Sequence, residues 1–274
     1  MSPVAVTVYQ GLAGDHNTRA IAGARAIGEA LEARFGIAPT VVAEAAPILN
    51  THWDVELDAA RGELRLLAEA VEAAAAAGRR PVTALTRCAA ALATLPVIAR
   101  HHPRACVVWF DAHADLNTPL TTPSGYLGGM ALAGAAGLWH AGLGTGHDLS
   151  HVVLVGTRDV DPTEQHVIDT HHVQVVKADA NVVDALREAI DGRPVYVHLD
   201  CDVLDPDLVP TDYVADDGLT FEQLRATCEA LAEGEVVGLE IAEFEHMWHD
   251  GGTPVSPAPL IDAIEPLLAR LERS

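Results

Sequence analysis

The stretch VVWFDAHADLNTP, residues 107–119, places three side chains that can bind metal ions directly after an apolar run. Asp111, His113 and Asp115 stand two residues apart in it. Because side chains alternate between the two faces of an extended chain, these three face one point if the chain stays extended past Phe110. We therefore expect a polar cluster at the carboxyl end of a buried strand, where the sites of parallel α/β sheets gather.

Two further segments repeat this pattern of acidic residues after an apolar run. HLDCDVLDP, residues 198–206, contains Asp200 and Asp202, and GLEIAEFEH, residues 238–246, contains Glu243. Buried carboxylates that gather in one place need cations to neutralise them, and two divalent ions are the simplest solution. A water that bridges two such ions loses a proton near neutral pH. The alternative is that these carboxylates form turns and cap helices, which is less expected for three such clusters.

Short β-rich runs alternate with Ala-rich helical runs along the chain. We expect strands at 5–9, 39–42, 81–85, 106–110, 151–156, 173–176, 194–199 and 236–241, and helices at 18–36, 64–78, 88–102, 219–234 and about 257–272. This alternation predicts an α/β fold with a parallel sheet buried on both faces. Eight strands fit a barrel or an open doubly wound sheet. Neither a linker nor an internal repeat is evident, so we expect a single domain, 1–274, in which the Gly-rich region 125–146 is a long connection.

The charge balance restricts the partners of the protein. The chain has 17 basic and 39 acidic residues, a net charge of −22, which disfavours binding to nucleic acid or to an anionic membrane. It has no apolar run long enough to span a membrane. The N-terminal MSPVAVTVYQ predicts a first strand rather than a signal peptide, and the four cysteines show no disulfide-framework spacing. We therefore expect a cytoplasmic protein.

DAHADLNTP, HLDCDVLDP and GLEIAEFEH resemble, in order and spacing, the signature segments of the arginase–agmatinase (ureohydrolase) family. The resemblance implies a three-layer α/β/α fold around an eight-stranded, mostly parallel sheet. It also implies a binuclear manganese centre, two Mn2+ ions, that hydrolyses guanidino groups through a metal-bridging hydroxide. The expected partner is a small-molecule guanidino amino acid. Family members often form trimers or hexamers, so a homo-oligomer agrees with the resemblance.

The resemblance also assigns roles to the acidic residues. It implies metal ligands at two ions: Asp111, Asp115 and Asp200 at one, and His113, Asp111, Asp200 and Asp202 at the other. Asp111 and Asp200 would bridge the ions. Asp115 would also receive the proton of the nucleophilic water, and Glu243 would hold the substrate guanidinium. His198, just before the second cluster, is expected to be a core residue or to support the ligands from behind.

The other end of the substrate has candidate contacts as well. VGTRDVDPTE, residues 155–164, resembles the segment in which arginases hold the α-amino group, through residues matching Asp161 and Glu164. Asn117 and Ser124 match positions that meet the α-carboxylate. These matches imply an arginine-like amino acid rather than agmatine, which lacks a carboxylate. The alternative, which is less favoured, is that these residues cap a helix or bond within a loop; Asp161, directly before Pro162 and a helical run, would suit an N-cap.

The sequence departs from the arginase pattern at one expected metal ligand. Arginases carry a histidine ligand in a GGDH-type segment, whereas this chain has PVTALTRCAAALATLP, residues 81–96, which places Cys88 at the ligand position and Arg87 beside it. A thiolate is softer than an imidazole and suits zinc or iron better than manganese. The alternative is that Cys88 is a small buried core residue and that one metal has lost a ligand.

A second departure lies in TPSGYLGGM, residues 122–130. Gly128 stands where arginases have a histidine that is thought to shuttle a proton to the leaving amine, and Tyr126 replaces an Asn that helps to bind the carboxylate. The proton must then come from water, from Tyr126 or from the substrate.

Both departures resemble a branch of the family that hydrolyses Nω-hydroxy-L-arginine to L-ornithine and hydroxyurea, in antibiotic biosynthesis leading to D-cycloserine. An N-hydroxyguanidine is less basic than a guanidine, so it can bind nearer its neutral form and depends less on a strong acid. The alternatives are an arginase that acts on L-arginine or a related guanidino acid, and, in a different class, a catalytically weak sensor that binds metal or an amino acid.

Overall fold

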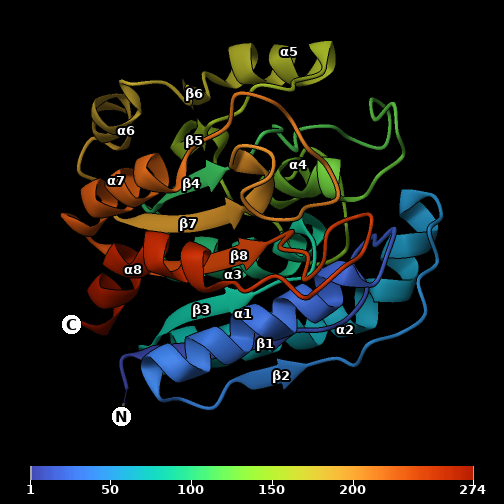
Figure 1. Ribbon diagram of the computed structural model, residues 1–274. Coiled ribbons are helices and arrows are strands. Elements are labelled where there is room, and N and C mark those ends of the chain that lie inside the picture. The colour runs from blue at the N-terminus through green and yellow to red at the C-terminus, as the bar shows by residue number, and fades with distance from the viewer. Residues whose placement is uncertain (1, 274) are drawn as a thin grey trace.

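A single eight-stranded sheet forms the centre of the protein (Figure 1). The computed structural model describes residues 2–273. The strands are β1 (Val4–Tyr9), β2 (Thr40–Val42), β3 (Arg80–Ala84), β4 (Cys106–Phe110), β5 (Val152–Val155), β6 (Gln174–Val176), β7 (Val195–Asp200) and β8 (Val236–Ala242). They lie in the order β2-β1-β3-β8-β7-β4-β5-β6, and every pairing is parallel. The open sheet decides against the barrel.

Helices cover both faces of this sheet. On one face lie α1 (Arg19–Phe35), α6 (Val182–Ile190), α7 (Phe221–Ala232) and α8 (Ala258–Glu272). On the other lie α2 (Trp53–Ala76), α3 (Ala91–His101), α4 (Ala131–Ala136) and α5 (Pro162–His171). The predicted three-layer α/β/α architecture is therefore confirmed.

Alternating side chains of the strands fill the two cores. In β4, for example, Val108 and Phe110 pack into one core, whereas Val107 and Trp109 pack into the other. Strands buried on both faces need apolar residues at almost every position, which is why they read as continuous Val-rich runs. The edge strands β2 and β6 are short and partly exposed.

Three helical regions differ from the sequence expectations. The helix expected at 64–78 begins at Trp53, because Leu57, Ala60 and Leu64 continue its buried stripe toward the N-terminus at helical spacing. The region 125–146, expected as a connection, contains the short helix α4, which ends at Gly137 with φ 85°. No helix was expected at α6, whose buried stripe of Val182, Leu186 and Ile190 spans only nine residues.

The strand order brings four strand ends together. The order β3-β8-β7-β4 is central, and the chain extends outward from β3 toward β2 and from β4 toward β6. This reversal makes a crevice at the carboxyl ends of the strands, where α/β sheets usually bind ligands. Cys88, Glu243, Asp200 and Asp111 belong to these four neighbouring strand ends.

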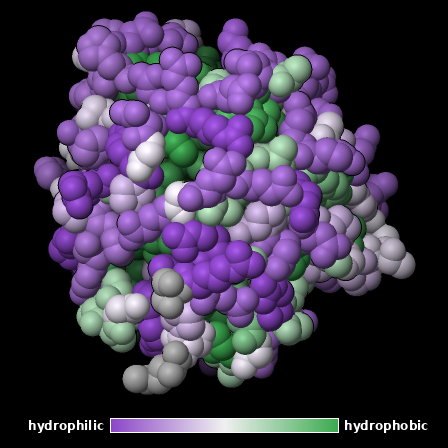
Figure 2. Space-filling view, turned by 90° about the vertical axis from the view of Figure 1, so that its left-hand side faces the viewer, coloured by the Kyte–Doolittle hydropathy of each residue, from purple (hydrophilic) through white to green (hydrophobic). Residues whose placement is uncertain are grey.

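The surface opposite this crevice is mainly polar. Figure 2 shows the face at the amino ends of the strands, where hydrophilic side chains surround small scattered hydrophobic areas. Among residues 2–273, we find no helix that is both long enough and apolar enough to cross a membrane.

Gly23 fixes the distance between α1 and the loop after β8. A Cβ atom at Gly23 would lie 1.7 Å from the carbonyl oxygen of Phe244. Because backbone cannot easily move away, we expect Gly23→Ala to lower the free energy of unfolding by about 2 kcal/mol or more. Chemical denaturation measures this change.

Gly62 provides the matched control, because it lies on the exposed side of α2 with nothing within 4 Å of its would-be Cβ. Gly62→Ala is expected to raise the free energy of unfolding by about 0.5–1 kcal/mol. If Gly23→Ala were as well tolerated as Gly62→Ala, the close approach of α1 to the loop would be wrong.

Candidate metal and substrate site

A pocket of ≈ 210 Å³ lies among the loops that follow the central strands. All but one of the predicted site residues line it: Cys88, His113, Asp115, Asn117, Ser124, Tyr126, Asp161, Glu164, Asp200, Asp202 and Glu243. The exception is Asp111, which is only 1% exposed. The structure thus brings together residues from five separate segments of the chain.

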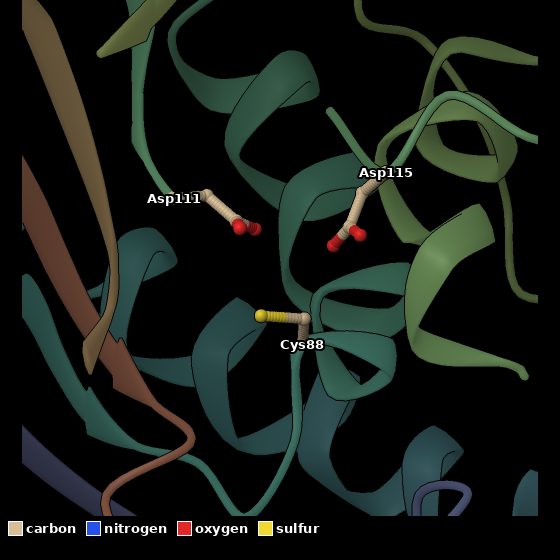
Figure 3. Close-up of side chains that lie close together, drawn as sticks. All are labelled: Cys88, Asp111 and Asp115. Carbon is tan, nitrogen blue, oxygen red and sulfur yellow. The ribbon is translucent and has the colours of Figure 1, made fainter. Parts of the chain in front are cut away.

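The potential metal ligands form three overlapping groups whose ligand atoms lie within 4.8 Å of one another. Their members are Cys88, Asp111 and Asp115 in the first group, Cys88, Asp200 and Glu243 in the second, and Asp111, His113 and Asp202 in the third. Figure 3 shows the first group, in which all three side chains point toward a common space. Because Asp111 belongs to two groups, its carboxylate lies between two potential ion positions.

The chain after β4 is not extended, so that part of the sequence prediction is wrong. The Oδ1 atom of Asp111 accepts a hydrogen bond of 2.6 Å from the backbone N–H of His113, and Asp115 has a left-handed φ of 52°. This Asx-type turn directs His113 toward Asp202 and Asp115 toward Cys88. The same turn recurs after β7, where Asp200 Oδ1 accepts from the N–H of Asp202 at 2.7 Å.

The buried carboxylates repel one another. Burial, together with the neighbouring acidic groups, raises the pKa of Asp111, Asp115 and Asp200. Burial also raises the pKa of Asp202, but the hydrogen bond and charge of His113 outweigh it and leave that pKa lowered. His113 alone therefore does not neutralise the four carboxylates.

The residues present fit divalent metal ions. The Oδ2 atom of Asp115 is buried and has no hydrogen-bond partner, which is unusual for a native protein. The Asp115 carboxylate to which this oxygen belongs faces the space that Cys88 and Asp111 share. Carboxylate, imidazole and thiol groups together suit a transition-metal ion, which would satisfy this oxygen and neutralise its neighbours.

Cys88 is buried, yet its sulfur faces polar groups. It stands at the start of a short 3₁₀ helix, Cys88–Ala90, between β3 and α3. Its thiol donates to Oδ2 of Asp200 at 2.9 Å, and burial and nearby carboxylates raise its pKa. This geometry favours the ligand role over that of an ordinary core cysteine, and metal binding would have to displace the thiol proton.

A buried polar chain supports Cys88 from behind. His198 Nε2 lies 3.2 Å from Cys88 Sγ, and His198 Nδ1 lies 2.7 Å from Oε1 of Glu240. The His198 ring stacks on Trp109 with a centroid distance of 3.5 Å. The supporting role expected for His198 agrees with these contacts, but the sequence analysis missed Glu240. The available signal was an acidic residue inside an apolar, buried strand: Glu240 lies two residues before Ala242, the last residue of β8.

Glu243 points into the pocket but is already paired. Its Oε2 atom lies 2.7 Å from Nη1 of Arg87, and its Oε1 atom accepts from the N–H of Cys88 at 2.9 Å. Burial raises the pKa of Glu243 to about 7, although Arg87 acts to lower it. The sequence analysis gave Arg87 no role. The signal for a role was that Arg87 is a basic residue directly beside the expected ligand Cys88 in a buried segment.

Three of the four residues predicted for the amino-acid end of the substrate form one connected set. Asn117 Nδ2 donates to Oδ2 of Asp161 at 2.8 Å, and Glu164 accepts from the N–H of Leu116 at 2.9 Å. Asp161 and Glu164 also form the capping box of α5. The N-cap and pocket-lining interpretations of Asp161 therefore both hold. Ser124 lies exposed at the pocket rim.

Tyr126 fills the space above Gly128. A Cβ atom at Gly128 would lie 2.4 Å from Cε1 of Tyr126, so a larger side chain there requires the ring to move. The Tyr126 hydroxyl lies 3.4 Å from Oε1 of Glu243. The two departures from the arginase pattern in this loop are therefore one coupled structural change.

Comparisons with known proteins agree with this fold and site. Residues 11–253 match the Arginase family. The chain is 38% identical over 259 residues, 94% of its length and 95% of the relative's, to an N(omega)-hydroxy-L-arginine amidinohydrolase of Streptomyces lavendulae. Arginase from Bacillus caldovelox superposes with a TM-score of 0.82 at 25% identity, covering 100% of this chain and 99% of that one.

Arginase from Entamoeba histolytica superposes with a TM-score of 0.85 over 97% of this chain and 98% of that one. At 19% identity, this likeness concerns the fold alone. Together with the match over residues 11–253, these similarities show that the chain belongs to the arginase family, whose members hydrolyse guanidino compounds at a binuclear metal centre.

Proposed function

We propose that the protein is a binuclear manganese amidinohydrolase that cleaves Nω-hydroxy-L-arginine to L-ornithine and hydroxyurea. The observation that carries this proposal is the buried Cys88 thiol, which shares its space with the acidic cluster. The similarity to a hydroxyarginine amidinohydrolase over nearly the whole chain supports the same substrate.

The chain supplies ligands for two ions at adjoining positions. One ion would be held by Cys88, Asp111, Asp115 and Asp200, and the other by Asp111, His113, Asp200 and Asp202. Bound ions would supply Lewis acidity and lower the pKa of water. Asp111, within reach of both ligand groups, would keep the two positions together.

The remaining site residues bind and orient the substrate. Asp161, Glu164, Asn117 and Ser124 would hold the α-amino and α-carboxylate groups, and Glu243 would hold the guanidino group at the opposite end. Asp115, whose carboxylate faces the shared space, would accept the proton of the attacking water.

The leaving amine needs a proton. Because residue 128 is a glycine here, no imidazole at that position can supply it. The Tyr126 phenol occupies that space, but burial raises its pKa well above the usual range, which makes it a weak acid. A substrate that depends less on a strong acid therefore fits this site better. This requirement favours the N-hydroxyguanidine over the guanidinium of arginine.

L-Arginine is the alternative substrate. The acidic metal ligands and the residues that would hold the α-amino and α-carboxylate groups do not distinguish L-arginine from Nω-hydroxy-L-arginine. A sensor without catalysis is disfavoured, since a binding module does not need acidic residues arranged for two ions.

The substrate preference is the first test. For the manganese-loaded protein we expect kcat/KM to be at least about tenfold higher with Nω-hydroxy-L-arginine than with L-arginine, a difference of roughly 1.4 kcal/mol in transition-state stabilisation. Ornithine formation measures both reactions in one assay, and hydroxyurea identifies the cleaved bond. Equal turnover, or a preference for arginine, would contradict the proposal.

Asp115→Asn tests the metal site. Asn tolerates the left-handed φ of this residue, so the turn should survive while one ligand charge is lost. We expect manganese affinity to fall at least about tenfold, as even indirect supports of metal ligands contribute this much. Calorimetric titration and the manganese-induced rise in Tm measure the loss.

The matched control is Asp207→Asn, because Asp207 is exposed and also left-handed, with φ 72°, but lies outside the ligand groups. It should bind manganese as the wild type does. Equal affinity in both variants would remove Asp115 from the ligand set.

The stabilisation by metal should depend on pH. The folded-state pKa values of Asp111, Asp115 and Asp200 are raised, so without metal the folded state binds more protons than the unfolded state. Stability of the metal-free protein therefore falls as pH rises through these values. Metal ions remove this penalty, so we expect the manganese-induced rise in Tm to grow from about pH 5.5 to about pH 7.5. A rise that is constant or shrinks over this range would speak against buried carboxylate ligands.

A further inference from the structure

Arg87 lies directly behind the proposed guanidino-binding residue. Its guanidinium is fully buried, and Nη1 lies 2.7 Å from Oε2 of Glu243. It also contacts Asp15 Oδ1 and Glu245 Oε1, each at 3.1 Å. The shortest of its ion pairs is thus the one to Glu243.

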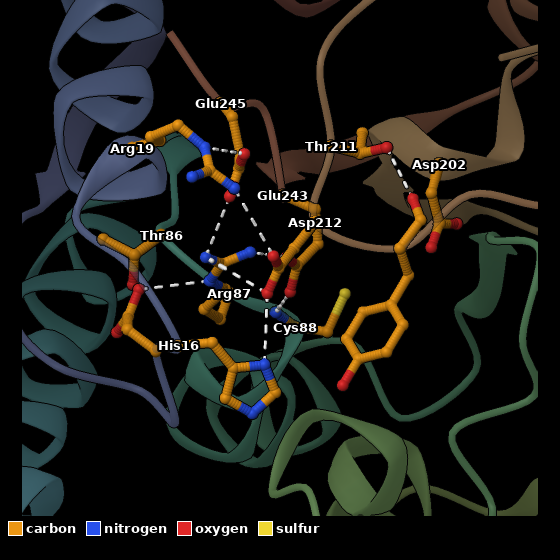
Figure 4. A network of polar contacts seen from close by, with 12 residues as sticks. His16, Arg19, Thr86, Arg87, Cys88, Asp202, Thr211, Asp212, Glu243 and Glu245 are labelled. Atoms are coloured by element: carbon orange, nitrogen blue, oxygen red, sulfur yellow. Dashed lines mark hydrogen bonds and ion pairs between the residues drawn. The ribbon is translucent and has the colours of Figure 1, made fainter. Parts of the chain in front are cut away.

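A wider network fixes Arg87 in this position. Figure 4 shows Arg87 at its centre, with Arg19 and Glu245 on one side and Cys88 on another. Arg19 pairs with both Glu245 and Asp212, and Asp212 lies 3.7 Å from Nη2 of Arg87. An arginine in such surroundings keeps its charge, and its planar fork has no free rotamer to turn away from Glu243.

Both oxygens of Glu243 are therefore already engaged by groups of the protein. Oε2 pairs with Arg87, and Oε1 accepts from the N–H of Cys88 and lies near the Tyr126 hydroxyl. A substrate guanidinium that binds Glu243 would come close to a second, immovable cation. A neutral group would use the remaining acceptor capacity of the carboxylate without that repulsion.

We propose that Arg87 is a specificity-determining residue that makes the guanidino subsite discriminate against a cationic guanidinium and accept a neutral N-hydroxyguanidine. This inference rests on the proposed amidinohydrolase function. Arg87 does not line the pocket, so it acts through Glu243 and is a positioning residue rather than a catalytic one.

The test compares the two substrates in variants that keep the local charge balanced. Arg87→Gln combined with Asp15→Asn removes one cation and one carboxylate from a direct ion pair, so the buried cluster keeps its net charge. In the manganese-loaded double variant we expect the ratio of kcat/KM for hydroxyarginine to that for arginine to fall about tenfold or more, mainly through a lower KM for arginine. A purely structural role would lower both kcat/KM values alike.

Two single variants complete the comparison. Arg87→Lys keeps the charge and should retain most of the preference. Asp15→Asn removes a competing partner of Arg87, leaves Glu243 more fully paired, and should preserve or strengthen the preference. If the double variant does not fold, the two single variants still test the inference: a preference retained in both supports it, and a loss of preference in either would overturn it.

The wild-type result separates this inference from the proposed function. If the wild type prefers hydroxyarginine and the double variant keeps the same ratio, Arg87 is not the selector although the function stands. If the wild type prefers arginine or cleaves neither substrate, the proposed function itself is wrong.

Discussion

Mutual repulsion among buried carboxylates is the constraint on which the rest of this structure depends. Asp111, Asp115, Asp200 and Asp202 are almost fully enclosed, and His113 is the one cationic side chain that pairs with this group within residues 2–273. Desolvating such charges costs several kcal/mol per ion unless partners compensate. A fold can hold them only on a rigid frame, and here that frame is the set of four central strands, buried on both faces.

The turns at the strand ends determine the direction in which each potential ligand side chain points. Asp111 and Asp200 each bind the backbone N–H two residues later, so each chain bends as soon as it leaves the sheet. The bend uses one carboxylate oxygen of each residue for the turn. The other oxygen accepts a hydrogen bond from Trp109 Nε1 in Asp111 and from the Cys88 thiol in Asp200. The sheet thus sets the distance between clusters, and the turns set which residues face each other.

Much of this arrangement could be predicted from the sequence, but its side-chain directions could not. All eight strands follow from apolar runs, and the acidic ligand candidates stand directly after two of these runs, whereas Cys88 follows only from the resemblance to the arginase family. The turn after Phe110 could not be read from alternation, because a side-chain-to-backbone hydrogen bond overrides the extended period there. The Arg87 network also escaped, since Asp15, Asp212 and Glu245 lie far apart in sequence and only the strand order brings them together.

Cys88 and Arg87 are consecutive residues that act on the same carboxylate from different sides. The backbone N–H of Cys88 donates to one oxygen of Glu243, and the Arg87 side chain pairs with the other. The Cys88 sulfur meanwhile faces Asp200, so one short segment after β3 contacts both the ligand cluster and the guanidino subsite. A change of ligand at position 88 therefore cannot be separated from the electrostatics of Glu243. Because the two effects share a rigid backbone, metal preference and substrate charge preference should change together when this segment changes.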